Sequence, residues 1–239
     1  MSCLNVPFWQ QGYNVGLFRF DSNHKIYLAQ SLEAMPWIEH GFGSRLTSDW
    51  PDTTRVVAVR QIHSNRVLVT EDGAAGWLGE GDAMVTRQPG LLLSIRTADC
   101  LPILIADPES RSVAAIHAGW RGTVADVAGN AVRTMMDRYG AQPSAMRVAI
   151  GPGIGSCCFE VGPEVATQFR PLFPERTDLD GRVHLDLVAA NIRLLRQLGI
   201  PEGQIDASGL CTVCDPATFE SYRRDREASG RMTSVIAIR

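Results

Sequence analysis

The sequence predicts a single domain in which layers of α-helix and β-strand surround a mixed sheet. The chain has 239 residues, of which 45% are hydrophobic, so it can build one generous core, and no linker-like stretch divides it. Short apolar runs typical of strands are interrupted by two segments with helical spacing. Because these elements intermix without a regular βαβ alternation, we expect an α/β protein with α plus β layers.

The expected strands are short runs of β-branched or apolar residues that end at polar or turn residues. In chain order they are 55–63, 66–70, 91–95, 101–106, 112–117, 146–150 and 233–238. The three strands between 91 and 117 follow one another closely, which predicts a meander. Their nearly continuous apolar character indicates that both faces are covered, so we expect helices on the sheet.

Two segments have the spacing of helices with one apolar face. The first begins after Gly122 and carries apolar residues at intervals of three and four up to a stop at Gly140. The second begins after Asp186, a residue suited to an N-cap, and stops at Gly199.

Charge and composition favour an intracellular protein that acts on a small molecule. The formal net charge is -3 without a block of Lys or Arg, which argues against nucleic acid or an anionic membrane as a partner. No apolar run approaches the roughly 20 residues that span a bilayer, and the first residues lack the order of a secretory signal. Six cysteines are too sparse for a disulfide scaffold. We therefore expect a cytoplasmic location and mostly reduced thiols.

The turn at 107–110 predicts a pair of candidate site residues. It lies between the strands that end at Ala106 and begin near Arg111, so these strands should form an antiparallel hairpin. If Asp107 faces Arg111, Cys100 falls opposite Ala118 or, one residue out of register, His117. A thiolate beside an imidazole serves either as a nucleophile with its base or as two ligands of a metal such as zinc.

His63 is the best third member of this group, because it ends a predicted strand before a polar turn. A set of two histidines and one cysteine leaves one position open on zinc, which is the pattern of a catalytic site. After His117 a glycine-containing turn leads from strand to helix at 117–123. Such a turn offers free N–H groups to an anion, and Arg121 would strengthen a phosphate site there.

At this point the motifs resemble the laccase-domain, or polyphenol-oxidase-like, purine nucleoside phosphorylase family. The resemblance begins near HGF at 40–42 and covers about the last 200 residues. It rests on several motifs in the same order, namely RQIH at 60–63, GDAMVT at 81–86, TADCLP at 97–102, HAGWRGT at 117–123, IGPGIG at 150–155, CFEVG at 158–162, HLDL at 184–187, CT at 211–212, SYRR at 221–224 and GRM at 230–232.

The resemblance implies a three-layer α-β-α sandwich with a mixed sheet over residues 1–239, and a zinc ion on His63, Cys100 and His117. It also implies phosphorolysis of adenosine, inosine, guanosine and methylthioadenosine to base and sugar 1-phosphate, with a side activity that deaminates adenosine. The partners would be a purine nucleoside and phosphate. Because some cysteine hydrolases share this fold, Cys100 could instead be the nucleophile of a hydrolase or amidase.

Other residues have weaker support. Asp82 and Asp99 flank the proposed site, and either could orient a ligand histidine or act as an acid or base, with Asp82 favoured. Arg45, Arg121 and Arg224 could bind phosphate through forked guanidinium contacts. The sequence departs from the family pattern at 43–45 and at Glu220, where an aromatic residue is common. The CTVC segment at 211–214 has the spacing of a zinc knuckle, but no second pair follows it, so we expect buried or incidental thiols.

The older laccase label suggests a copper-dependent oxidase of phenols, which we rank below zinc chemistry. A multicopper oxidase needs a blue-copper site and a separate histidine-rich cluster. This chain has five histidines and no His-x-His pair, so copper is the less favoured metal.

Overall fold

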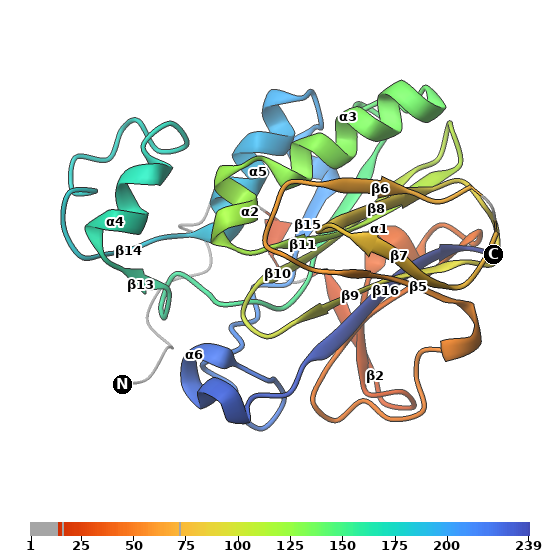
Figure 1. Ribbon diagram of the computed structural model, residues 1–239, viewed down its shortest axis with the longest axis horizontal. Coiled ribbons are helices and arrows are strands. Elements are labelled where there is room, and N and C mark those ends of the chain that lie inside the picture. Colours follow the sequence, from red (N-terminus) through yellow and green to blue (C-terminus); the bar gives the residue numbers. More distant parts are fainter. Residues whose placement is uncertain (1–13, 16, 72) are drawn as a thin grey trace.

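The structure is a computed structural model that describes residues 14–15, 17–71 and 73–239, and two seven-stranded mixed sheets dominate it (Figure 1). The first sheet has the order β1(Asn14–Val15), β15(Ile205–Ala207), β12(Arg147–Ile150), β10(Leu101–Asp107), β11(Ser112–Ala118), β8(Ala83–Thr86), β6(Val67–Val69). The second has the order β2(Phe18–Asp21), β3(Ile26–Ala29), β4(Ile38–Gly43), β16(Met232–Ile238), β9(Leu92–Thr97), β5(Val56–Arg60), β7(Gly76–Glu80). A small ribbon joins β13(Glu160–Val161) to β14(Val183–His184).

Helices cover one face of the first sheet. They are α2(Trp120–Val124), α3(Val127–Tyr139) and α5(Leu187–Gln197), and Figure 1 shows them together above β11 and β8. The shorter helices α1(Gln30–Glu33), α4(Pro163–Ala166) and α6(Tyr222–Asp225) lie elsewhere on the chain. In the part of the chain that the structure describes, no helix is both long and apolar enough to cross a membrane.

The mixed α/β class predicted from the sequence is confirmed, and the layers follow the order helix, sheet, sheet. Along β10, Leu101, Ile103 and Ile105 pack in the core with the helices, whereas Leu104 and Ala106 pack in the core between the two sheets. This alternation is the period of two that a strand imposes on its side chains. The apolar strands are therefore covered on both faces as expected, but a second sheet supplies the cover on the far side.

The predicted meander between residues 91 and 117 is wrong. β9 pairs with β16 and β5 in the second sheet, while β10 pairs with β11 and β12 in the first. Local sequence could not distinguish these partners, because each strand is simply a buried apolar run. The chain therefore crosses from one sheet to the other at 98–100, and this crossing contains Cys100.

The hairpin of β10 and β11 is confirmed with a register one residue from the value used above. Asp107 pairs with Ser112 and Leu101 pairs with Ala118, so Cys100 lies just outside the ladder. Three of the predicted helix boundaries hold, since Asp186 caps α5 by accepting from the Ala189 N–H, α5 stops before Gly199, and Gly140 ends α3 with φ of 69°. The predicted start after Gly122 is wrong, because Gly122 lies inside α2 and the chain breaks before α3, which begins at Val127 with Asp126 as its N-cap. These local features place His117 at the end of a central strand.

Candidate active site

Three side chains from separate parts of the fold converge at one end of the first sheet. His63 follows β5, Cys100 immediately precedes β10, and His117 is the next-to-last residue of β11. Their donor atoms all lie within 4.8 Å of one another. The two imidazole rings meet edge to face, with centroids 4.9 Å apart and an interplanar angle of 81°. The structure therefore brings together the three residues that the sequence singled out.

Asp82 lies beneath this group and is completely buried. Its Oδ1 accepts a hydrogen bond from His117 Nδ1 at 2.8 Å and from the His63 backbone N–H at 3.0 Å. Its Oδ2 accepts from the Ser64 backbone N–H at 2.6 Å and from the Ser64 hydroxyl at 2.7 Å. One carboxylate thus fixes the His117 ring and the backbone that carries His63. Because Nδ1 of His117 donates to Asp82, Nε2 is the nitrogen left to face the site.

The electrostatics of the group follow from these contacts. Burial alone would raise the pKa of Asp82, but hydrogen bonds from His117 and Ser64 lower the pKa to about 2. Burial would likewise raise the pKa of Cys100, and hydrogen bonds with His117 and His63 bring it down to about 6. For His117, burial is opposed by the hydrogen bonds to Asp82 and Cys100, and the pKa rises to about 9. The pair favours a thiolate beside an imidazolium.

The backbone around the site is tightly constrained. His63 has φ of 58° and Asp99 has φ of 83°, a region that non-glycine residues seldom occupy and that often marks functional sites. Gly119 comes so close that an added Cβ would lie 2.8 Å from Cys100 Sγ and 3.3 Å from His63 Cδ2. Only glycine therefore fits between β11 and α2 at this point.

Asp99 ties the Cys100 segment to the C-terminal part of the chain, whereas the sequence suggested only that it could orient a histidine or act as an acid or base. Its Oδ1 accepts from the Thr212 hydroxyl and its Oδ2 from the Arg223 backbone N–H, both at 2.6 Å. These partners lie more than 110 positions away. The only signal in the sequence was the position of Asp99 beside Cys100.

The three arginines suggested as phosphate ligands have different surroundings. The Arg121 guanidinium is exposed and lies 4.4 Å above the Trp120 ring. Arg45 donates to the Pro216 carbonyl and pairs with Glu220 at 3.4 Å, so the two departures from the family pattern contact each other.

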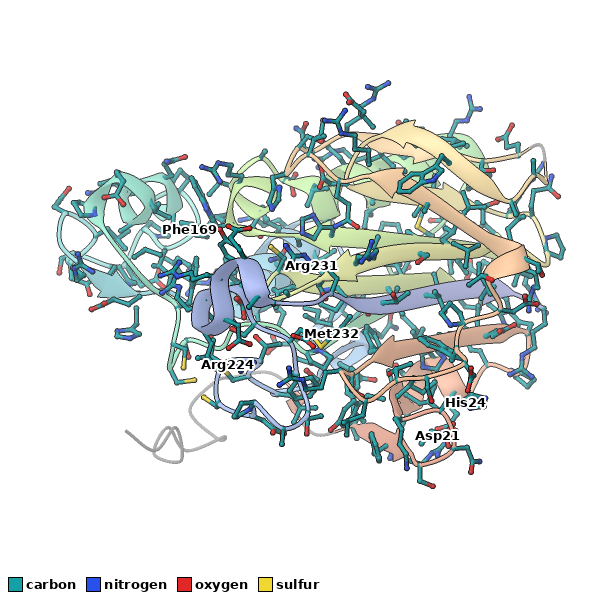
Figure 2. The ribbon with its side chains drawn as sticks, turned by 60° about the horizontal axis from the view of Figure 1, so that its bottom comes forward. Asp21, His24, Phe169, Arg224, Arg231 and Met232 are labelled. Carbon is teal, nitrogen blue, oxygen red and sulfur yellow. The ribbon has the colours of Figure 1, made fainter. Side chains whose placement is uncertain are left out.

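Arg224 is already engaged in holding its own part of the chain. It donates to the Thr212 and Phe219 carbonyls and to both oxygens of Asp225; Figure 2 shows it on α6. Its guanidinium is therefore less available to a ligand than that of Arg121.

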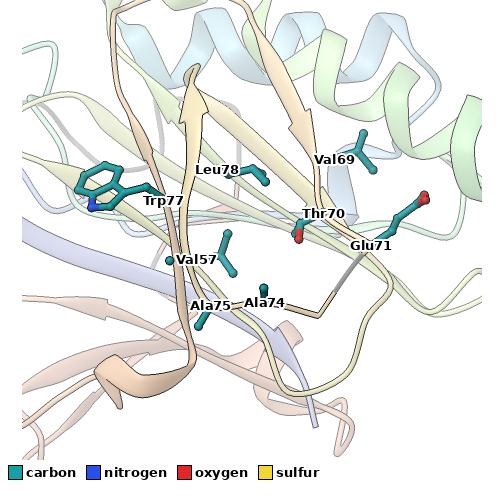
Figure 3. A pocket seen from close by; sticks show the side chains of 9 residues that line it. Val57, Val69, Thr70, Glu71, Ala74, Ala75, Trp77 and Leu78 are labelled. Carbon is teal, nitrogen blue, oxygen red and sulfur yellow. The ribbon is translucent and has the colours of Figure 1, made fainter.

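A cavity of about 180 Å³ lies at another part of the molecule (Figure 3). Val57, Val69, Thr70 and the largely exposed Trp77 are among the residues that line it. Val57 pairs with Gly76 near the start of β5 and β7, whereas His63 follows the end of β5. The lining includes none of the three converging residues or Asp82.

Comparison with known proteins identifies relatives of this chain. A sequence model of the family described as multi-copper polyphenol oxidoreductase laccase matches residues 44–239. A purine nucleoside phosphorylase of Deinococcus radiodurans is 43% identical over 182 residues, covering 75% of this chain and 69% of the relative. An adenosine deaminase, RL5, from an unknown prokaryotic organism is 39% identical over 199 residues, covering 77% of this chain and 76% of that protein.

A further relative, the purine nucleoside phosphorylase YlmD of Geobacillus stearothermophilus, is 40% identical over 66% of this chain, and the match spans 60% of its own length. Solved structures have the same fold. The hypothetical protein YfiH of Bacillus licheniformis superposes with a TM-score of 0.84 at 30% identity, covering 93% of this chain and 99% of the other. Together with the family match over most of the sequence, these findings show that the chain belongs to the multi-copper polyphenol oxidoreductase laccase family.

Proposed function

We propose that this protein is a zinc-dependent purine nucleoside phosphorylase that also deaminates adenosine. The reaction would convert adenosine, inosine, guanosine or methylthioadenosine and phosphate into the free base and a sugar 1-phosphate. The observation that carries the proposal is the convergence of His63, Cys100 and His117 around one buried carboxylate. Relatives described as purine nucleoside phosphorylases and as an adenosine deaminase support a nucleoside as the substrate.

The donor set fits zinc. Two imidazoles and one thiolate are ligands that zinc takes at about 2.0–2.3 Å, and three protein ligands leave one position for a substrate or water. Donor atoms within 4.8 Å of one another can reach a single ion at those distances. Such an ion would act as a Lewis acid and stabilise the negative charge that develops during the reaction.

Asp82 acts in this proposal as a positioning residue. Both of its oxygens are saturated by donors from His117, His63 and Ser64, so no lone pair is left to take a proton from substrate. It keeps His117 in the tautomer whose Nε2 faces the site and raises the basicity of that ligand. Cys100, His63 and His117 would hold the zinc ion, and Asp82 keeps the two histidines in place.

We assign phosphate binding to the segment around Arg121. Its guanidinium is exposed, and α2 lies against the site, because a Cβ on Gly122 would be 3.2 Å from the Ser64 carbonyl. A guanidinium forks onto phosphate oxygens with charge-assisted hydrogen bonds. Arg45 and Arg224 have protein partners already, which makes them weaker candidates.

The direct test is release of hypoxanthine from inosine by the zinc-loaded protein, with and without phosphate. We expect hypoxanthine release only when phosphate is present. A chelator should abolish this activity, and added zinc should restore it. Cys100→Ala should be inactive. If Cys100→Ala matches the wild type and no base is released, the proposal is wrong.

Two reagents, iodoacetamide and a chelator, distinguish the cysteine hydrolase alternative from the zinc-dependent enzyme. If Cys100 acts as a nucleophile, iodoacetamide abolishes activity while a chelator leaves it intact. If Cys100 is a metal ligand, the chelator alone removes activity.

The family description keeps a copper oxidase of phenols as the other candidate. The positions of the histidines argue against it. Of the five, only His63 and His117 meet; His40 is buried and accepts the Ala29 N–H, while His24 and His184 are exposed. Oxygen consumption with a phenol substrate and a blue-copper absorption band would reverse this ranking.

A further inference from the structure

Four cysteine sulfurs gather at a second place in the molecule. Cys157 and Cys158 lie in the loop after β12, and Cys211 and Cys214 lie in the segment that follows β15. All four sulfurs are within 4.8 Å of one another. Cys214 Sγ is 3.4 Å from Cys157 Sγ and 3.5 Å from Cys158 Sγ. The sequence placed no second pair after Cys211 and Cys214, but the fold supplies one from more than 50 positions upstream.

The spacing of the sulfurs matches a tetrahedral site for one ion. Zinc–sulfur bonds of about 2.3 Å at tetrahedral angles put neighbouring sulfurs about 3.8 Å apart. A disulfide would instead require about 2.0 Å, so neither Cys157 nor Cys158 is joined to Cys214 at the observed distances. Four-cysteine iron–sulfur clusters distribute their thiolates over two or four irons, whereas these four sulfurs lie within 4.8 Å of one another, close enough to share one ion.

The surroundings of the sulfurs are also those of a metal–thiolate centre. The Gly155 backbone N–H donates to Cys211 Sγ at 3.3 Å. The Arg223 guanidinium donates to the Cys158 carbonyl at 3.2 Å, which brings a positive charge beside the group. Four thiolates and one divalent ion carry a net charge of about −2, and such outer hydrogen bonds and cations stabilise it.

We propose that Cys157, Cys158, Cys211 and Cys214 bind one zinc ion that is separate from the ion at His63, Cys100 and His117. Cys157, Cys158 and Cys211 are not part of a disulfide, whereas Cys214 is disulfide-bonded in this structure. The complete site therefore forms in the reduced chain. A phosphine or dithiol reductant supplies the two electrons that, with two protons, convert that disulfide into two thiols. Zinc then binds four thiolates and displaces their protons.

This ion would hold together two segments that support Cys100. The loop of Cys157 and Cys158 follows Ile154, whose backbone N–H donates to the Asp99 carbonyl at 2.8 Å. The segment of Cys211 contains Thr212, whose hydroxyl donates to Asp99 Oδ1. Both segments are thus hydrogen-bonded to Asp99, the residue that precedes Cys100. A structural ion of this kind closes a long loop and adds to the free energy of folding.

The test is the metal content of the reduced, zinc-loaded full chain, measured for the wild type and for two reciprocal variants. His63→Ala removes a ligand of the first site, and the double variant Cys157→Ser with Cys211→Ser removes two ligands of the second. We expect two zinc ions per wild-type chain and one in each variant. The double variant should also unfold at a lower temperature, and each chain's circular dichroism would confirm that it is folded.

A cobalt titration of His63→Ala gives a second measurement that does not depend on the folding of the double variant. Cobalt bound by four thiolates should produce an intense sulfur-to-metal absorption band with an endpoint at one equivalent. The His63→Ala result tests the second site whatever the first site binds. A failure of the four-cysteine site can therefore be distinguished from a failure of the proposed phosphorolysis. A reduced His63→Ala chain without zinc and without this band would overturn it, as would a folded double variant that retains two zinc ions.

Discussion

Replacing Asp82 by Asn tests the site with the smallest change in shape. The carboxylate is fully buried and receives donors on both oxygens. The Asn amide has one oxygen and one NH₂ group in place of the two carboxylate oxygens. In one orientation the NH₂ group faces His117 Nδ1 and the His63 N–H, and in the other it faces the N–H and hydroxyl of Ser64. Either orientation removes acceptors from the loop or shifts the proton of His117 to Nε2, the nitrogen proposed to bind the metal.

The expected magnitude follows from the lost contacts. Loss of an outer-shell partner of a metal-binding histidine typically costs 10- to 100-fold in metal affinity. Leaving a buried backbone donor without its acceptor costs about 1–3 kcal/mol. With two donors affected, we expect the free energy of unfolding to fall by about 2–6 kcal/mol.

The assay combines zinc affinity, measured by competition with a chromophoric chelator, and urea unfolding of the same preparation. Asp107→Asn is a matched control, because Asp107 is equally buried at the far end of the β10–β11 hairpin and accepts from the Ser110 N–H. The control should keep wild-type zinc affinity. If Asp82→Asn binds zinc as tightly as the wild type and retains its phosphorolysis, the positioning role is refuted.

Three further predictions concern the close packing at Gly119, the charge of Arg121 and the pH dependence of stability caused by His40. Gly119→Ala should lower zinc affinity and activity, because its Cβ would lie 2.8 Å from Cys100 Sγ, whereas Gly203→Ala, with no atom within 4 Å, should leave both unchanged. Arg121→Ala should raise KM for phosphate by about 10- to 100-fold with little change in KM for inosine, since hydrogen bonds to charged groups contribute about 1.5–3 kcal/mol; equal increases in both would contradict the assignment. Burial lowers the pKa of His40 to about 4, below its unfolded value of about 6.5. Its contribution is therefore present above pH 6.5 and is lost as the pH falls from 6.5 to 4, by roughly 3 kcal/mol. Urea unfolding at several pH values should show this loss in the wild type and in the control His184→Gln, and a His40→Gln variant that loses as much would refute it.

Local pattern determined much of the secondary structure. Apolar runs bounded by turn residues marked β10, β11 and β16, and capping residues such as Asp186 and Gly140 marked the ends of helices. These features depend on contacts between near neighbours in the chain, which is why one sequence suffices to read them. The register of the β10–β11 hairpin was within one residue for the same reason.

The pairing of strands into two sheets required the tertiary structure. β9 and β10 are both buried apolar runs, and nothing in either one records whether its partner is the next strand or β16, more than 130 residues away. Which strand pairs with which depends on the packing of both hydrophobic cores, and not on the intrinsic strand preference of each segment.

The sequence alone was enough to select the candidate site residues, because few residue types bind a soft divalent ion, and His63, Cys100 and His117 stand in motifs that resemble one family. Only the fold decided how they are held. Asp82 reaches two of them through one carboxylate, and Asp99 joins the Cys100 segment to Thr212. Likewise, the four sulfurs meet because the segments that follow the parallel strands β12 and β15 lie side by side. Such contacts arise from the packing of segments far apart in the chain, and the spacing of residues along one strand or helix does not record them.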